Sequence, residues 1–128
     1  MPRDAQGVAR EWLEVASGDL AGAELMLGNP STPRQASYLA QQCVEKALKA
    51  LLSSCNTPFP KTHDLTELVA LLAPDSGIHA LDIDWPTLTE WAVRGRYPGT
   101  GPAAMTAEAV IAVESARRVL SLVQAEIC

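Results

Sequence analysis

Apolar residues recur every three or four positions along most of this chain, which is the spacing of a helix packed on one side. The spacing holds from about Ala5 to Leu27, from about residue 33 to 54, and from 106 to 127. Residues 28–30, Gly-Asn-Pro, end the first segment, because glycine suits the closing residue of a helix and proline cannot continue one. Thr106 is expected to cap the last segment. The alternation typical of strands is absent, so the pattern predicts helices and no sheet.

The second helix begins with a capping signal. Thr32 is a good N-cap residue, Pro33 is favoured at the first helical position, and Gln35 completes a capping box. The helix is expected to end near Ser54.

Two shorter helices are expected in the middle of the chain. Thr62 is expected to cap the first, with Asp64 in its first turn, where the helix dipole favours a carboxylate. Residues 74–77, Pro-Asp-Ser-Gly, end that helix. Asp84 is expected to cap the second, which covers about residues 81–93.

Together these segments predict an all-α fold: an up-and-down antiparallel bundle of four main helices plus a short helix, in one domain spanning residues 1–128. A length of 128 residues suits one domain. No apolar run approaches the roughly 20 residues that cross a bilayer, and the first residues lack the apolar core of a signal peptide. We therefore expect a cytoplasmic protein that does not associate with a membrane.

Charge and cysteine content narrow the function classes. The formal net charge is −5, which disfavours binding nucleic acid through phosphates alone but leaves room for a local basic site. The three cysteines, Cys43, Cys55 and Cys128, include no Cys-x-x-Cys pair. We interpret them as neither a disulfide framework nor a zinc site. Cys43 falls in the apolar pattern and is expected to be a small core residue.

The two histidines, His63 and His79, do not have metal-ligand spacing, so neither a metal nor a cofactor is expected. His63 stands beside Asp64 at a predicted helix start, and this position favours a structural role. No pair of carboxylates is placed by the sequence for acid/base work.

Residues 37–52 combine a long apolar face with a tight polar group, made of Gln41, Gln42, Glu45, Lys46 and Lys49. Gln42 and Lys46 are one helical turn apart, and so are Glu45 and Lys49. Spacing alone favours an amphipathic helix whose polar face is in water. The alternative is that these four side chains form part of a binding site.

A second candidate site is the loop at residues 94–102, which has three glycines and two prolines. Arg94 and Arg96 are suited to holding phosphate oxygens in a two-pronged way. Tyr97 can stack on a base or donate its hydroxyl. The alternative is an exposed loop with solvated arginines and a packed tyrosine.

The motifs resemble, in content and order, those of the HEPN family, the higher eukaryote and prokaryote nucleotide-binding domain. The resemblance rests on residues 41–52 (Gln-Gln-Cys-Val-Glu-Lys-Ala-Leu-Lys-Ala-Leu-Leu), on Thr-His-Asp-Leu at 62–65 and on Arg-Tyr-Pro at 96–98. Residues 12–23 fit as well, so the resemblance covers about residues 10–123.

This resemblance implies a helical bundle that commonly forms homodimers. It also implies a frequent partner, a small (minimal) nucleotidyltransferase, the two acting as a toxin–antitoxin-like pair. It suggests a nucleotide- or partner-binding role for the matching residues, which are Gln42, Glu45, Lys46, Lys49, Arg96 and Tyr97. Arg94, in the same loop, is a further candidate for phosphate binding.

The catalytic motif of the family is incomplete here. Many members of the family are metal-independent ribonucleases. These members share a motif in which an arginine is followed four to six residues later by a histidine. In this chain no histidine follows Arg94 or Arg96, because the last one is His79. We therefore name no catalytic residue and predict a non-catalytic domain that binds a nucleotide or RNA phosphate. Two alternatives stay open: a metal-independent endoribonuclease that uses Arg96, and a purely structural dimerising module.

Overall fold

The computed structural model describes residues 4–94 and 102–127, and the described part of the chain is all-helical. Its elements, in chain order, are α1 (Ala5–Leu27), α2 (Pro33–Ser54), α3 (Leu65–Ala70), the 3₁₀ helix η1 (Gly77–Ala80), α4 (Trp85–Arg94) and α5 (Pro102–Glu126). No strand occurs within the two described ranges. The prediction of an all-helical bundle is confirmed.

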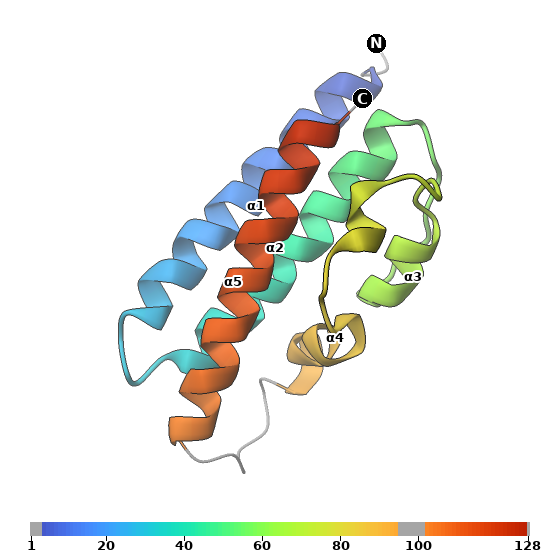
Figure 1. Ribbon diagram of the computed structural model, residues 1–128. Coiled ribbons are helices and arrows are strands. Elements are labelled where there is room, and N and C mark those ends of the chain that lie inside the picture. The colour runs from blue at the N-terminus through green and yellow to red at the C-terminus, as the bar shows by residue number, and fades with distance from the viewer. Residues whose placement is uncertain (1–3, 95–101, 128) are drawn as a thin grey trace.

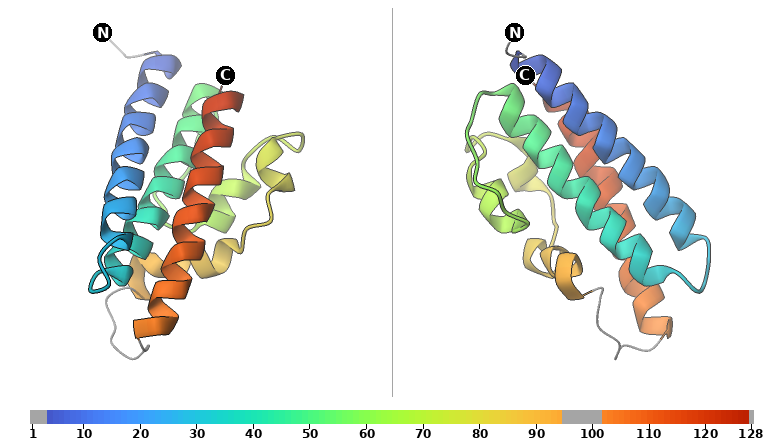
Figure 2. Two further views of the ribbon diagram at one scale, coloured as in Figure 1. Left: turned by 60° about the vertical axis from the view of Figure 1, so that its left-hand side comes forward. Right: turned by 180° about the vertical axis from the view of Figure 1, so that it is seen from behind.

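Three long helices, α1, α2 and α5, run side by side along the molecule (Figure 1). α1 is antiparallel to both of the others. α2 and α5 run in the same direction, because α3, η1 and α4 lead the chain back along one flank of α2 (Figures 1 and 2). α2 contacts α1, α3, α4 and α5, and is therefore the central element of the bundle.

This central position explains why α2 is buried on more than one face. Of its 22 residues, 15 are buried. Small side chains at Ala40, Cys43 and Ala47 allow close helix contact, and Leu48 is fully buried. Burying one leucine side chain contributes about 1.5–3 kcal/mol. The polar residues that α2 carries are therefore held against neighbouring elements on several sides.

The helix starts agree only in part with the predicted caps. Thr32 is the N-cap residue of α2, but its side chain accepts no capping hydrogen bond. Its hydroxyl instead donates to the carbonyl of Met26, at 2.6 Å, in the last turn of α1. The predicted capping box is therefore absent.

The short helices are capped by aspartates. Asp64, and not Thr62, is the N-cap of α3 and accepts from the Thr66 amide at 3.0 Å. The hydroxyl of Thr62 accepts instead from the amide of Asp64, before the helix begins. Asp84 accepts from the Thr87 amide at 3.1 Å, which confirms its predicted capping role.

Two further expectations about the helices are corrected. α5 begins at Pro102, so Thr106 lies inside the helix and is not its cap. Proline at the first position needs no amide donor, which permits the earlier start. Helix η1 was not expected, because a single 3₁₀ turn has no apolar period of its own. Within the described ranges, no helix combines the length and apolar character that crossing a membrane requires.

The cysteines differ from expectation at one position. Cys43 is a free, buried thiol, as its place in the apolar pattern predicts. Cys55, the C-cap residue of α2, is disulfide-bonded, so the expectation of no disulfide is wrong there. A disulfide needs proximity in space, which sequence spacing alone does not report. Because disulfides are uncommon in a reducing cytoplasm, the cytoplasmic location stays a prediction.

Candidate functional site

The carboxylate of Glu45, on the central helix α2, is fully buried. One of its oxygens, Oε2, accepts from Lys49 Nζ at 3.0 Å and from Lys46 Nζ at 3.3 Å. The other, Oε1, lies 2.8 Å from His63 Nδ1 and accepts from Gln41 Nε2 at 3.2 Å. We call this group the Glu45 cluster; its members are Gln41, Gln42, Glu45, Lys46, Lys49 and His63.

The geometry of α2 places three members in one row. Gln41, Glu45 and Lys49 are spaced by four residues, so their side chains stack along one face of the helix. Gln42 donates to Gln41 Oε1 at 2.6 Å and extends the row sideways. Buried polar atoms need partners, and each of these side chains supplies one for its neighbour.

The loop between α2 and α3 completes the cluster. His63 comes from this loop, 18 positions after Glu45 in the sequence. The loop is also held through its backbone, because Gln41 Nε2 donates to the His63 carbonyl at 3.4 Å. α2 and the loop are therefore joined by one polar network.

Aromatic rings line the two lysines. The centroid of the Trp12 ring on α1 lies 5.6 Å from both Lys46 Nζ and Lys49 Nζ. The Phe59 ring lies 5.9 Å from Lys49 Nζ. Such cation–π contacts contribute roughly 0.5–2 kcal/mol each, more where water is excluded. Trp12, which the apolar pattern placed in the core, is in fact half-buried and serves as a wall of the site.

The pKa values of two carboxyl groups of the site are shifted in opposite directions. Burial acts to raise the pKa of Glu45, but the hydrogen bonds from His63, Lys49 and Gln41 outweigh burial and hold that pKa below its usual range. Burial raises the pKa of Asp19 on α1; the nearby Lys46 opposes this rise and the charge of Glu45 adds to it. Glu45 is therefore the stable anion to which both lysines are paired.

Exposure to solvent separates the members of the cluster. The side chain of Lys49 is 10% exposed and that of Lys46 is 21% exposed, whereas that of His63 is 70% exposed. Lys46 and His63 are thus the charged or titratable members of the cluster that are most exposed to solvent. Lys49 is an internal partner of Glu45.

The structure brings together four of the predicted site residues and adds three that the sequence reasoning missed. Gln42, Glu45, Lys46 and Lys49 all belong to the cluster, so the interpretation of a polar face in water is wrong for Glu45 and Lys49, which are buried. The residues that were not predicted to belong to the site are Gln41, His63 and Trp12. Gln41 was grouped with the polar residues of this helix but was not named as a site residue.

The other predicted site residues are not tested. Arg94 is the last residue of α4, and its side chain lies outside the described part of the structure. Arg96 and Tyr97 also lie outside the described residues. As for metal chemistry, the described ranges contain no group of three or more His, Cys, Asp or Glu residues able to hold a metal ion.

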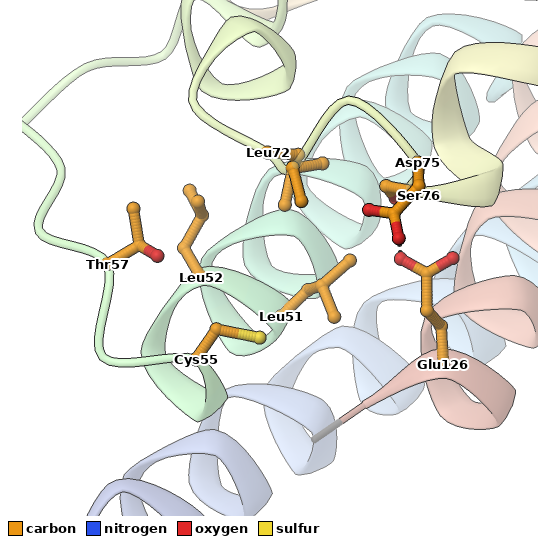
Figure 3. A pocket seen from close by; sticks show the side chains of 9 residues that line it. Leu51, Leu52, Cys55, Thr57, Leu72, Asp75, Ser76 and Glu126 are labelled. Atoms are coloured by element: carbon orange, nitrogen blue, oxygen red, sulfur yellow. Dashed lines mark hydrogen bonds between the residues drawn. The ribbon is translucent and has the colours of Figure 1, made fainter.

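A separate cavity of about 270 Å³ lies at the far end of α2, beside the end of α5 (Figure 3). Its walls include Leu51, Leu52 and Leu72, together with the polar residues Ser76 and Glu126. Ser76 donates to Glu126 Oε2 at 2.5 Å, and the Gly77 amide donates to Oε1 at 2.7 Å. Both oxygens of Glu126 are therefore used to hold η1 against α5.

The buried thiol of Cys43 stays protonated and unreactive near neutral pH. Burial raises its pKa to about 12, and the charges of Asp19 and Glu24 add to the rise. A thiol in this state is neither a nucleophile nor a metal ligand near neutral pH.

Fold and site together define a helical-bundle domain with an internal charged cluster at its central helix. Residues 9–126 match the model of the HEPN domain, and the chain belongs to this family. In the solved structures it is similar to TT1696 from Thermus thermophilus, with a TM-score of 0.73 and 27% sequence identity. That similarity covers 91% of this chain and 96% of the other. No curated protein matches the chain.

Proposed function

We propose that this HEPN domain binds a nucleotide or RNA phosphate at the Glu45 cluster and does not itself catalyse a reaction. We further propose that it acts as a homodimer beside a small nucleotidyltransferase, in a toxin–antitoxin-like pair. The observation that supports phosphate binding is the state of Lys46, which is charged, partly exposed and held in place by two neighbours.

An ammonium group has three hydrogen-bond donors. Lys46 uses one on Glu45 Oε2, and its charge lies over the Trp12 ring. Because these contacts already restrict the side chain, a phosphate that binds Lys46 loses less side-chain entropy than one that binds a free surface lysine. Lys49 is a poorer candidate, since it is enclosed by Glu45, Trp12 and Phe59.

The glycine-rich loop at residues 94–102 holds the further candidates of this proposal. Arg94 and Arg96 would bind further phosphate oxygens, and Tyr97 would stack on a base. Their roles rest on residue type and on the family resemblance, so they are tested by substitution.

Thermal unfolding against a panel of nucleoside mono-, di- and triphosphates and a short oligouridylate, with and without magnesium, tests the proposal. A ligand at about 100 times its dissociation constant stabilises the fold by roughly 2.7 kcal/mol, which raises the midpoint by several degrees. Lys46→Gln and Arg96→Ala should each reduce the shift. Arg118→Gln, which replaces an exposed cationic residue on α5 outside the Glu45 cluster, is the control and should leave the shift unchanged.

Two outcomes would overturn the proposal. If no ligand shifts the midpoint, or if Arg118→Gln reduces the shift as much as Lys46→Gln does, phosphate is not bound at this site. If the oligouridylate is cleaved by the wild type and not by Arg96→Ala, the non-catalytic assignment fails and the ribonuclease alternative replaces it.

The assembly part is tested separately by light scattering across a dilution series. A homodimer has twice the chain mass of 13.6 kDa. Addition of a purified nucleotidyltransferase should give a larger complex of defined mass. A monomer at every concentration would remove the dimer, and stable assembly with no phosphate binding would favour the structural module.

A further inference from the structure

We propose that His63 contacts the ligand directly: its imidazolium, held by Glu45, donates from Nε2 to a phosphate oxygen, so phosphate binding strengthens when His63 is protonated. This inference rests on the phosphate-binding function proposed above and assigns it a specific residue and a pH dependence.

The hydrogen bond to Glu45 orients the imidazole. Nδ1 lies 2.8 Å from Glu45 Oε1, and a carboxylate accepts, so Nδ1 carries a hydrogen in both charge states of the ring. The opposite nitrogen, Nε2, is then an acceptor in the neutral ring and a donor in the charged ring. No described residue forms a hydrogen bond with Nε2, and 70% of the side chain is exposed. The ring is therefore oriented by the protein on one edge and open to a ligand on the other.

His63 and Lys46 converge on the same carboxylate. Lys46 donates to Oε2 of Glu45 and His63 contacts Oε1, so both side chains are held by the same carboxylate. A phosphate group presents several oxygens, and two neighbouring donors can share it. Lys46 and His63 are also the most accessible titratable or charged members of the Glu45 cluster.

The charges around the site explain why a proton on His63 matters. On α2 and α1, Lys46 and Lys49 are opposed by Glu45 and Asp19. In the loop, the charged residues nearest to His63 in the sequence are Lys61 and Asp64, whose charges also cancel. Without a charge on His63, this set is balanced. Protonation of His63 adds the net positive charge that favours an anion.

His79 provides an internal control, because the chain contains two histidines. Its Nε2 lies 3.0 Å from the carbonyl of Ala73, so the ring is engaged with the backbone near η1. His79 is exposed, as is His63, but does not contact the Glu45 cluster.

The first arm of the test measures binding of a 3′-labelled oligouridylate with a free 5′-hydroxyl between pH 5.5 and 8. Its phosphodiesters do not change charge in this range, whereas a phosphomonoester titrates near pH 6. We expect binding about tenfold tighter at pH 5.5 than at pH 8, as for one charged hydrogen bond. Adenosine monophosphate, measured in parallel, distinguishes a nucleotide ligand from an RNA ligand.

Four variants assign the pH dependence. His63→Gln should remove most of it, and His63→Lys should retain binding with little dependence on pH. His79→Gln should behave as the wild type. Asp19→Asn removes the nearby carboxyl group whose pKa is raised. The pH dependence of binding that is due to His63 should remain in this variant.

The second arm follows both imidazoles by NMR with and without the oligouridylate. Bound phosphate should shift the ring resonances of His63 and leave those of His79 unchanged, a result that a merely structural role for His63 would not produce.

The outcomes separate the two proposals. If neither the oligouridylate nor any nucleotide of the panel binds at any pH, the proposed function fails and this inference fails with it. If they bind, Lys46→Gln weakens binding, and His63→Gln has the same pH profile as the wild type, phosphate binding stands and the role of His63 is overturned.

Discussion

The ammonium group of Lys49 lies 3.0 Å from the carboxylate of Glu45, one helical turn away, and both side chains are withdrawn from solvent. On an exposed helix face, this pair would contribute about 0.2–0.5 kcal/mol. For a buried pair the free-energy cost of losing one partner is larger. Removing one partner of a buried ion pair typically costs about 3–5 kcal/mol, because the other charge is left buried without compensation.

Glu45→Gln and Lys49→Met are therefore expected to lower the free energy of unfolding by about 3 kcal/mol each. The double variant Glu45→Gln/Lys49→Met should lose less than the sum of the two single losses, by about 1–3 kcal/mol, because it leaves neither charge of this pair without its partner. Urea unfolding of the four proteins measures this coupling. The exposed substitution Lys61→Gln should stay within about 0.5 kcal/mol of the wild type. Additive losses would mean that the two side chains do not interact energetically.

The stability of the fold should fall in acid more steeply with Glu45 present than without it. The pKa of Glu45 is lower in the folded than in the unfolded chain. Its stabilising contribution is therefore fully present above the unfolded pKa and is lost as the pH falls through the folded one. Unfolding free energies at pH 7, 5, 4 and 3 should converge between wild type and Glu45→Gln as the pH falls.

The contribution of Asp19 to stability should change with pH in the opposite direction to that of Glu45. Its pKa is raised in the folded chain, so the cost of its buried charge is relieved as the pH falls through the raised value. Asp19→Asn should accordingly be more stable than the wild type near neutral pH, with the difference shrinking in acid. A constant difference at every pH would show that the titration of Asp19 is not coupled to folding.

Glu126 is expected to hold η1 in place. Its carboxylate accepts from the Ser76 hydroxyl and from the Gly77 amide, about 50 positions earlier in the chain. Glu126→Ala should cost about 1–2 kcal/mol, since hydrogen bonds to charged groups contribute about 1.5–3 kcal/mol and this site is partly open to water. Hydrogen exchange of the Gly77 amide should accelerate at the same time.

Glu114→Ala is the matched control for Glu126, because its ion pair with Arg117 is exposed. Surface pairs of this kind contribute about 0–1 kcal/mol. Equal losses for the two variants, or an unchanged exchange rate at Gly77, would show that Glu126 does not anchor η1.

The helices were predictable because their signals are local. The apolar period placed α1 at Ala5–Leu27 and α2 to Ser54, and the structure has the same bounds. Asp84 was identified as a cap for the same reason. The start of α5 was missed, because Pro102 was attributed to the preceding loop by composition.

The candidate site was predictable only in part. Gln42, Glu45, Lys46 and Lys49 share one helix, so their spacing alone grouped them. His63 was interpreted as structural, because its contact with Glu45 joins positions 18 apart across a loop whose path no periodicity describes. Trp12 was placed in the core, and its position over both lysines depends on how α1 packs against α2.

By itself, the sequence determined where helices form, where most of them end, and which polar residues lie on the same helix. Helical hydrogen bonds and caps connect residues within about four positions, so neighbours in the chain carry that information. The tertiary structure decided that the polar row of α2 is buried, that His63 completes it, and that the pKa of Glu45 falls while that of Asp19 rises. Burial and the balance of nearby charges depend on which helices and loops cover a residue, and these come from distant parts of the chain.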